Sequence, residues 1–247
     1  MGAIYIMWLR QLKRYFRSPS RIAGSLGQPL LFMVAFGFGL GPIFKQAGQG
    51  NYIEFLVPGV IAMTLLFTSI FSGIEIIWDR QFGFLKETLV APVSRLSIMF
   101  GRTLGGATLA IMQGILVLLM SFIIGFKLNT ETLLLALIFM SLIALAFTAL
   151  GTLIASRMRD FHGFQMIMNF LVMPLFFLSG AMFPLQGLPN AFNIIIRLNP
   201  LSYGVDGLRG ALTGVFYYGA ATDLIMLIVF TSIFTILGSY MFSKIEV

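Results

Sequence analysis

Six stretches, each of about 20 to 25 residues and almost free of charged side chains, occupy most of this 247-residue chain. The hydrocarbon core of a bilayer is about 30 Å thick, so a helix needs roughly 20 apolar residues to cross it. Lipid offers no hydrogen-bond partner to exposed backbone groups, which restricts spanning structures to helices and closed barrels. The six runs are continuous and do not alternate with a period of two. They therefore predict helices rather than a transmembrane barrel.

We expect an all-α integral membrane protein with six transmembrane helices in a single domain, residues 1–247. The composition agrees, since 58% of the residues are hydrophobic and 10% are charged, outside the usual range of soluble globular domains. The first run is too long for a signal-peptide core and lacks a small-residue cleavage site, so we expect it to be an uncleaved span. The predicted spans cover residues 22–44, 55–78, 103–126, 132–156, 163–183 and 224–243.

The basic residues predict how the chain is oriented in the membrane. Twelve of the sixteen lysines and arginines flank the predicted spans on one side, and basic residues are retained in the cytoplasm during insertion. We therefore expect a multi-pass protein of the cell membrane, plasma or inner, with both termini in the cytoplasm. The net charge of +7 reflects this topology, and we expect no nucleic acid partner.

An amphipathic segment, residues 3–17, precedes the first span. On a helical wheel Arg10, Lys13, Arg14 and Arg17 share an arc of about 100°, and the apolar side chains face away from it. This pattern predicts an interfacial helix with its cations toward anionic lipid headgroups or a cytoplasmic partner. A topology signal with no further role is the alternative.

The second predicted span carries a polar stripe. Thr64, Thr68 and Ser72 recur every four residues, and Glu75 falls on the same arc. Two interpretations stay open. In the first, the hydroxyls bond to carbonyls one turn earlier and Glu75 reaches the interface. In the second, the stripe lines a substrate path or a dimer seam.

Two segments between the spans are irregular. In the cytoplasmic segment, residues 80–95, charges of both signs alternate with large apolar side chains, a mixture that suits a protein groove; a short helix is expected there, ended by Pro92. Residues 184–220 are too hydrophobic for a free loop and too rich in proline and glycine for one span. They predict short external helices or a re-entrant hairpin packed against protein.

The chain offers little catalytic or ligand chemistry. It has no cysteine and one histidine, His162, in a short charged turn, so we expect no metal site. No GxxxxGK[ST] phosphate loop is present, and we expect no catalytic residue and no cofactor bound by this chain. Glu75 is the one ionisable group inside a predicted span, which makes an ion-coupled carrier the weaker hypothesis.

Three segments resemble those of one transporter family. Residues 178–184 read LSGAMFP and are followed by Leu188-Pro189; residues 199–209 read NPLSYGVDGLR; KETL at 86–89 is followed by APVSR at 91–95. In this order and spacing the chain resembles the membrane subunits of type 2 ABC exporters, permeases for drugs, polyketides, lipids and polysaccharides. The resemblance covers essentially the whole chain.

The resemblance implies a division of labour between subunits. Two permease subunits, identical or paralogous, would pair in the lipid membrane, each resting on a cytoplasmic ATP-binding cassette subunit that binds ATP and Mg. Residues expected to couple to the ATPase are Lys86, Glu87, Thr88, Leu89, Pro92 and Arg95. The translocation path would include Thr64, Thr68, Ser72, Glu75, Gln165, Asn169 and Met173. The external gate motif would comprise Gly180, Pro184, Asn199, Pro200, Tyr203, Asp206 and Arg209.

The function expected from these observations is export, with the path formed by this chain and the energy supplied by a separate ATPase. The first alternative is an ATP-independent secondary transporter or channel. The second is an intramembrane enzyme or an assembly scaffold, for which the sequence offers no catalytic constellation.

Overall fold

The computed structural model describes residues 2–46, 50–128, 130–184 and 189–245, and within these ranges the chain is helical with no strand. The α-helices are α1 (Gly2–Phe16), α2 (Pro19–Gln46), α3 (Tyr52–Phe71), α4 (Ile74–Gln81), α5 (Phe84–Val90), α6 (Arg95–Ser121), α7 (Leu133–Arg157), α8 (Phe161–Phe177), α9 (Asn190–Leu198), α10 (Pro200–Thr213) and α11 (Ala220–Ser243). Two 3₁₀ turns, η1 (Phe122–Ile124) and η2 (Thr130–Thr132), lie between α6 and α7.

Five helical segments of the described chain are long and apolar enough to cross a membrane. They are Ile22–Gln46, Tyr52–Gln81, Arg95–Ile124, Leu133–Arg157 and Ala220–Ser243. The expected all-α membrane fold is confirmed.

The fifth predicted span, 163–183, corresponds to the shorter helix α8 and a turn. α8 has 17 residues, which at 1.5 Å per residue reach about 26 Å, less than the bilayer core. The chain then turns, and Gly180 takes a φ of 77°, a left-handed conformation open to glycine. The end of the apolar run is therefore a turn rather than a helix. The predicted span was too long because hydropathy alone does not indicate where the chain reverses.

The second span is interrupted between α3 and α4. At this point Gly73 lies so close to α7 that a Cβ on it would be 2.5 Å from the carbonyl oxygen of Gly151. A Cβ on Gly151 would likewise be 2.5 Å from the Ile70 carbonyl oxygen. Paired glycines thus allow the two backbones to touch, as small residues do between membrane helices.

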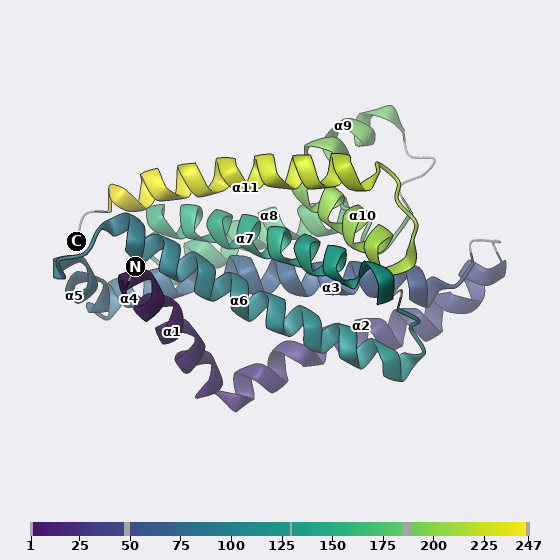
Figure 1. Ribbon diagram of the computed structural model, residues 1–247, viewed down its shortest axis with the longest axis horizontal. Coiled ribbons are helices and arrows are strands. Elements are labelled where there is room, and N and C mark those ends of the chain that lie inside the picture. The colour runs from purple at the N-terminus through teal and green to yellow at the C-terminus, as the bar shows by residue number, and fades with distance from the viewer. Residues whose placement is uncertain (1, 47–49, 129, 185–188, 246–247) are drawn as a thin grey trace.

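α3 forms the centre of the bundle. It packs against α2, α6, α7 and α10, and α11 lies along α7 on the side away from α2 (Figure 1). In the most apolar part of the second span 78% of the residues are buried inside the protein, whereas 17% are buried in the first span and 11% in the last. The outer faces of α2 and α11 are therefore open to lipid or to another subunit.

α1 crosses the outside of the bundle and packs against α6. Met7, Gln11 and Tyr15 form its buried side, and Gly101 of α6 leaves the space in which Met7 lies. Figure 1 shows the start of α1 and the end of α11 toward the same end of the bundle as α4 and α5. We call this the α5 end; α9 lies at the opposite end.

Candidate functional site

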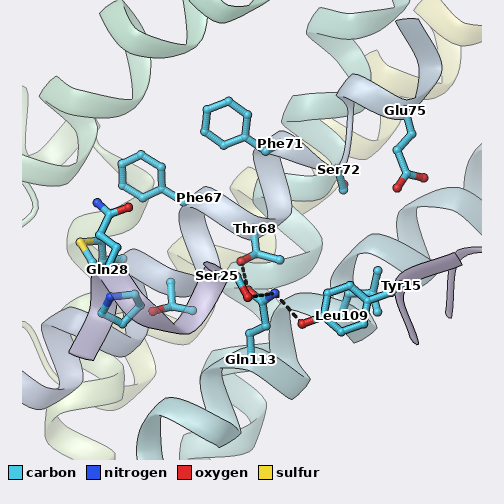
Figure 2. A pocket seen from close by; sticks show the side chains of 13 residues that line it. Tyr15, Ser25, Gln28, Phe67, Thr68, Phe71, Ser72, Glu75, Leu109 and Gln113 are labelled. Carbon is cyan, nitrogen blue, oxygen red and sulfur yellow. Dashed lines mark hydrogen bonds between the residues drawn. The ribbon is translucent and has the colours of Figure 1, made fainter. Parts of the chain in front are cut away.

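A cavity of about 250 Å³ opens among α1, α2, α3 and α6 (Figure 2). We call it the polar cavity, because eight of the thirteen side chains that line it carry an oxygen or a nitrogen. These are Tyr15, Ser25, Gln28, Thr64, Thr68, Ser72, Glu75 and Gln113. Polar groups at membrane depth are costly unless they find partners or face a cavity, so this is the strongest candidate site in the described part of the chain.

The Gln113 amide holds the four helices around the cavity together. Its Nε2 donates to the Tyr15 hydroxyl at 2.8 Å and to Ser25 Oγ at 2.9 Å, and Thr68 Oγ1 donates to its Oε1 (Figure 2). With 2% of its surface exposed, the amide has both donors and its carbonyl satisfied. Sequence reasoning missed Gln113, although it is the one side-chain amide in the third predicted span.

The predicted polar stripe of the second span faces this cavity. Thr64 Oγ1 donates to the Val60 carbonyl at 2.9 Å, and Ser72 Oγ donates to the Ser69 carbonyl at 2.6 Å. The hydroxyls of Thr64 and Ser72 bond to their own helix, whereas that of Thr68 donates to Gln113 of α6. All three side chains line the polar cavity. The first interpretation holds for part of the stripe but not for Glu75, which is buried rather than at the interface. The substrate path or dimer seam stays a prediction.

Glu75 lies at the α5 end of the polar cavity and belongs to a charge cluster of five residues from α1, α4 and α6. The members are Arg10, Arg14, Glu75, Asp79 and Arg102. Asp79 Oδ2 accepts from Arg102 and lies 3.3 Å from Arg10 Nη2, and Asp79 Oδ1 lies 3.6 Å from Arg14 Nη1. Arg14 Nη1 is 3.8 Å from Glu75 Oε2.

The charge cluster changes the expectation for the amphipathic segment. Arg10 and Arg14 turn toward carboxylates of α4 inside the protein, where lipid headgroups or a cytoplasmic partner were expected. Lys13 and Arg17 remain exposed. The pairing was missed because Asp79 and Arg102 sit at span ends, where charges are usually solvated.

The three path residues predicted on α8 lie elsewhere. Asn169 and Met173 are exposed and Gln165 is half-buried, whereas Phe164 and Met168 face the protein. None of the three lines the polar cavity. They follow a face of α8 that no described part of the chain covers.

The predicted coupling segment contains α5, and the chain leaves this helix before Pro92 as expected. Leu85 is fully buried and anchors α5, whereas Glu87 and Pro92 are exposed. Thr88 Oγ1 donates to the Phe84 carbonyl at 2.8 Å. The side chains of Lys86 and Leu89 lie outside the described part of the structure.

Arg95, also predicted to couple, has a partner within the chain. Its Nη1 donates to the carbonyls of Ser243 at 2.6 Å and Ile245 at 3.0 Å. It therefore completes the end of α11, where helix carbonyls lack intrahelical donors.

The external motif residues form a hydrogen-bonded cluster around α10. Pro200 occupies the first turn of α10, Asn199 Oδ1 accepts from the Leu201 amide at 3.0 Å, and Asn199 Nδ2 donates to the Leu175 carbonyl at 2.7 Å. The Tyr203 hydroxyl donates to the Arg197 carbonyl at 2.8 Å. Asp206 accepts from the amides of Tyr217 and Tyr218.

Arg209 joins the two external motifs. Its Nη2 donates to the Gly180 carbonyl at 2.8 Å and to that of Phe55 at 3.3 Å, and its guanidinium lies 3.9 Å from the Phe55 ring centroid. Burial lowers the pKa of Arg209 to about 10, against the opposing effect of the Asp206 carboxylate. Pro184 lines a cavity of about 230 Å³ beside these groups.

No group of three or more His, Cys, Asp or Glu side chains in the described ranges is arranged to hold a metal ion. The chemistry of the polar cavity is hydrogen bonding and charge, and its position among membrane helices suits binding or passage.

Comparison with known proteins places these features in one family. The profile of the family described as ABC-2 type transporter matches residues 2–213. The chain is 30% identical over 210 residues to the transport permease ycf38 of Cyanophora paradoxa, covering 83% of this chain and 72% of that one. It is 28% identical over 212 residues to Nodulation protein J of Rhizobium leguminosarum bv. trifolii, covering 85% and 78%.

A third relative is the inner membrane transport permease YadH of Escherichia coli, 25% identical over 231 residues, covering 92% of this chain and 90% of that protein. The family match extends from α1 through α10 and so includes the polar cavity, the charge cluster and the external motifs. The chain belongs to the ABC-2 type transporter family, as a multi-pass membrane permease.

Proposed function

We propose that this chain is the permease subunit of an ABC exporter in the cell membrane, with its α5 end in the cytoplasm. It pairs with a second permease subunit, identical or paralogous, and each rests on a separate ATPase that binds ATP and Mg. Nucleotide binding supplies the free energy that shifts the permease between two arrangements. The relatives named as transport permeases support the membrane role.

The observation that carries the proposal is the exposed apolar surface around α5. Phe82 is 71% exposed, Phe84 50% and Val90 85%, although all three lie in a segment that the basic residues place in the cytoplasm. Large apolar groups exposed together to water mark an interaction surface. The charged Glu87 beside them suits a protein groove, and the ATPase is the partner expected for it.

The polar cavity supports the proposal that this chain forms part of the translocation path. It adjoins the charge cluster through Glu75, and α4 of that cluster leads directly into α5. Motion of α5 therefore reaches residues at the cavity wall through one short helix.

The uncovered face of α8 supports pairing with a second permease. Met166 is 62% exposed and Phe170 77%, and the polar Gln165 and Asn169 lie near them on the same helix. A second subunit there would place the α8 residues of the predicted path at a subunit boundary. The external motifs at the other end would shape the outer gate.

The test is co-purification of the tagged permease with a candidate ATP-binding cassette ATPase that is co-expressed with it. We expect Glu87→Lys combined with Phe84→Ser to abolish co-purification and substrate-stimulated hydrolysis of ATP. The control is Glu54→Lys, which reverses an exposed glutamate at the other end of α3 and should leave both unchanged. Retention of the ATPase by the α5 variant at the control level would refute coupling through α5.

The alternative of an ATP-independent transporter is tested with the permease alone in liposomes. Substrate movement down an ion gradient in the absence of any ATPase would establish it and exclude the proposal.

A further inference from the structure

A cleft of about 580 Å³ separates α1 from the corner where α4 leads to α5. We call it the basic cleft. Arg10, Lys13 and Arg14 of α1, with Arg17 directly after this helix, line one side, and Asp79 and Phe84 lie opposite. It is distinct from the polar cavity, with which it shares no lining residue.

The basic cleft holds an excess of positive charge. Its one carboxylate, Asp79, is already within ion-pair distance of Arg10 and Arg14 and also accepts from Arg102, which approaches from α6. Across the described ranges no carboxylate lies within ion-pair distance of Lys13 or Arg17. These two cations are therefore available to an anion, and Asp79 is neutralised by its own partners.

The surroundings of the cleft are apolar as well as basic. Ile6 of α1 is 63% exposed and Phe84 of α5 is 50% exposed, and both line the cleft. A soluble anion gains nothing from such neighbours, whereas a lipid has glycerol and acyl groups next to its phosphate. The mixture of cations and exposed apolar groups is that of an interfacial lipid-binding helix.

The position of α1 sets the depth of the cleft. α1 ends at Phe16, and the first membrane-spanning segment starts at Ile22, so Arg17 and Lys13 precede that segment by five and nine residues. Phosphate groups of the lipid leaflet occupy this depth, and juxtamembrane cations are drawn to the anionic ones.

We propose that the basic cleft binds the headgroup of an anionic membrane phospholipid, with its phosphate between Lys13 and Arg17 and its glycerol region against Ile6 and Phe84. The bound lipid fastens α1 to the α4–α5 corner from the outside, as the charge cluster does from the inside. The site shares Phe84 with the proposed ATPase-coupling surface, whereas its two anion-binding side chains, Lys13 and Arg17, lie outside that surface.

The experiment measures phospholipid retained by the purified full chain, after reconstitution in nanodiscs of phosphatidylcholine mixed with phosphatidylglycerol and release into native mass spectrometry. The wild-type chain should retain phosphatidylglycerol selectively. Lys13→Gln combined with Arg17→Gln should weaken that binding roughly 30-fold, from about 1 kcal/mol per cation near the membrane surface. Arg10 and Arg14 are left intact because they hold Asp79.

The matched control is Lys45→Gln combined with Lys127→Gln, which removes the same charge from exposed positions at the other end of the bundle. It should retain phosphatidylglycerol at the wild-type level. Equal loss in both double variants would overturn the proposal in favour of general surface charge, and unchanged retention by the α1 variant would overturn it outright.

A competition arm identifies the source of the phosphate. Inorganic phosphate and glycerol phosphate should fail to displace the lipid, because they lack the apolar contacts. Displacement by either at concentrations comparable to the lipid would overturn the lipid assignment. Loss of the co-purified ATPase by the α1 variant, with lipid retention unchanged, would assign the basic cleft to a protein partner instead.

Discussion

Asp79 of α4 and Arg102 of α6 form an ion pair in the protein interior, with 4% and 3% of their side-chain surfaces exposed. Two further arginines, Arg10 and Arg14 of α1, approach the same carboxylate from the half-exposed side. A single carboxylate thus joins three helices at the point where the second span leads into α5. Removing it would leave buried positive charge without a counter-ion.

The first prediction concerns this carboxylate. Asp79→Asn should lower the free energy of unfolding by about 3 to 5 kcal/mol, because an uncompensated buried charge is left behind. The measurement is the thermal unfolding midpoint of the purified chain in detergent, followed by light scattering or tryptophan fluorescence.

The double variant Asp79→Leu with Arg102→Met serves as the control for the pair. Because it removes both buried charges, it should recover part of the lost stability despite carrying two substitutions. A single variant as stable as wild type, or a double variant less stable than the single one, would contradict the assignment.

The second prediction concerns the polar cavity. Gln113→Leu removes the partner of the Tyr15 and Thr68 hydroxyls, and we expect it to cost about 1 to 3 kcal/mol of stability because buried polar groups lose their hydrogen bonds. Gln165→Leu makes the same chemical change on the uncovered face of α8 and should cost little. Equal effects of the two variants on thermal unfolding would argue against the Gln113 network.

Much of the fold follows from the sequence, because each span is a local property. A run of about 20 apolar residues must become a helix in lipid wherever its neighbours lie. The irregular segments between the spans were also predictable, because Pro92 and the glycines near Gly180 restrict or free the backbone directly. The end of α8 was not predictable, because a mostly apolar run such as residues 178–183 is compatible with both a helix and a buried turn.

The site was only partly predictable. Thr64, Thr68 and Ser72 share one face of one helix, so their period reveals them. Gln113 and Tyr15 contact that face from two other helices. They are 98 residues apart in the sequence, so no helical periodicity relates them. Arg102 of α6 and Asp79 of α4 meet only once both helices are in place in the bundle. Contacts of this kind depend on tertiary arrangement, which the local pattern does not encode.

The third prediction concerns the packing of α1 against α6. Gly101→Ala should push α1 away from α6, since a Cβ there would be 2.6 Å from Met7 Cβ and 2.7 Å from the Ile4 carbonyl oxygen. We expect a loss of about 1 to 3 kcal/mol from overpacking and faster proteolysis within α1. Gly39→Ala, with no atom within 4 Å, is the matched control. Identical protease sensitivity in the two variants would show that α1 does not depend on this contact.

The last prediction concerns Asp223 in the first turn of α11. Its side chain is fully buried beside the carboxylate of Asp206. Asp223→Asn keeps the shape and adds an N–H donor that can meet the Asp206 carboxylate. We expect it to raise stability by about 1 to 3 kcal/mol, because it replaces two carboxyl groups buried side by side by an amide that donates to a carboxylate. Asp160→Asn is the control: Asp160 caps α8 from an exposed position, where asparagine caps equally well. A drop in the unfolding midpoint of Asp223→Asn, with Asp160→Asn unchanged, would show instead that the fold requires the carboxylate at position 223 itself.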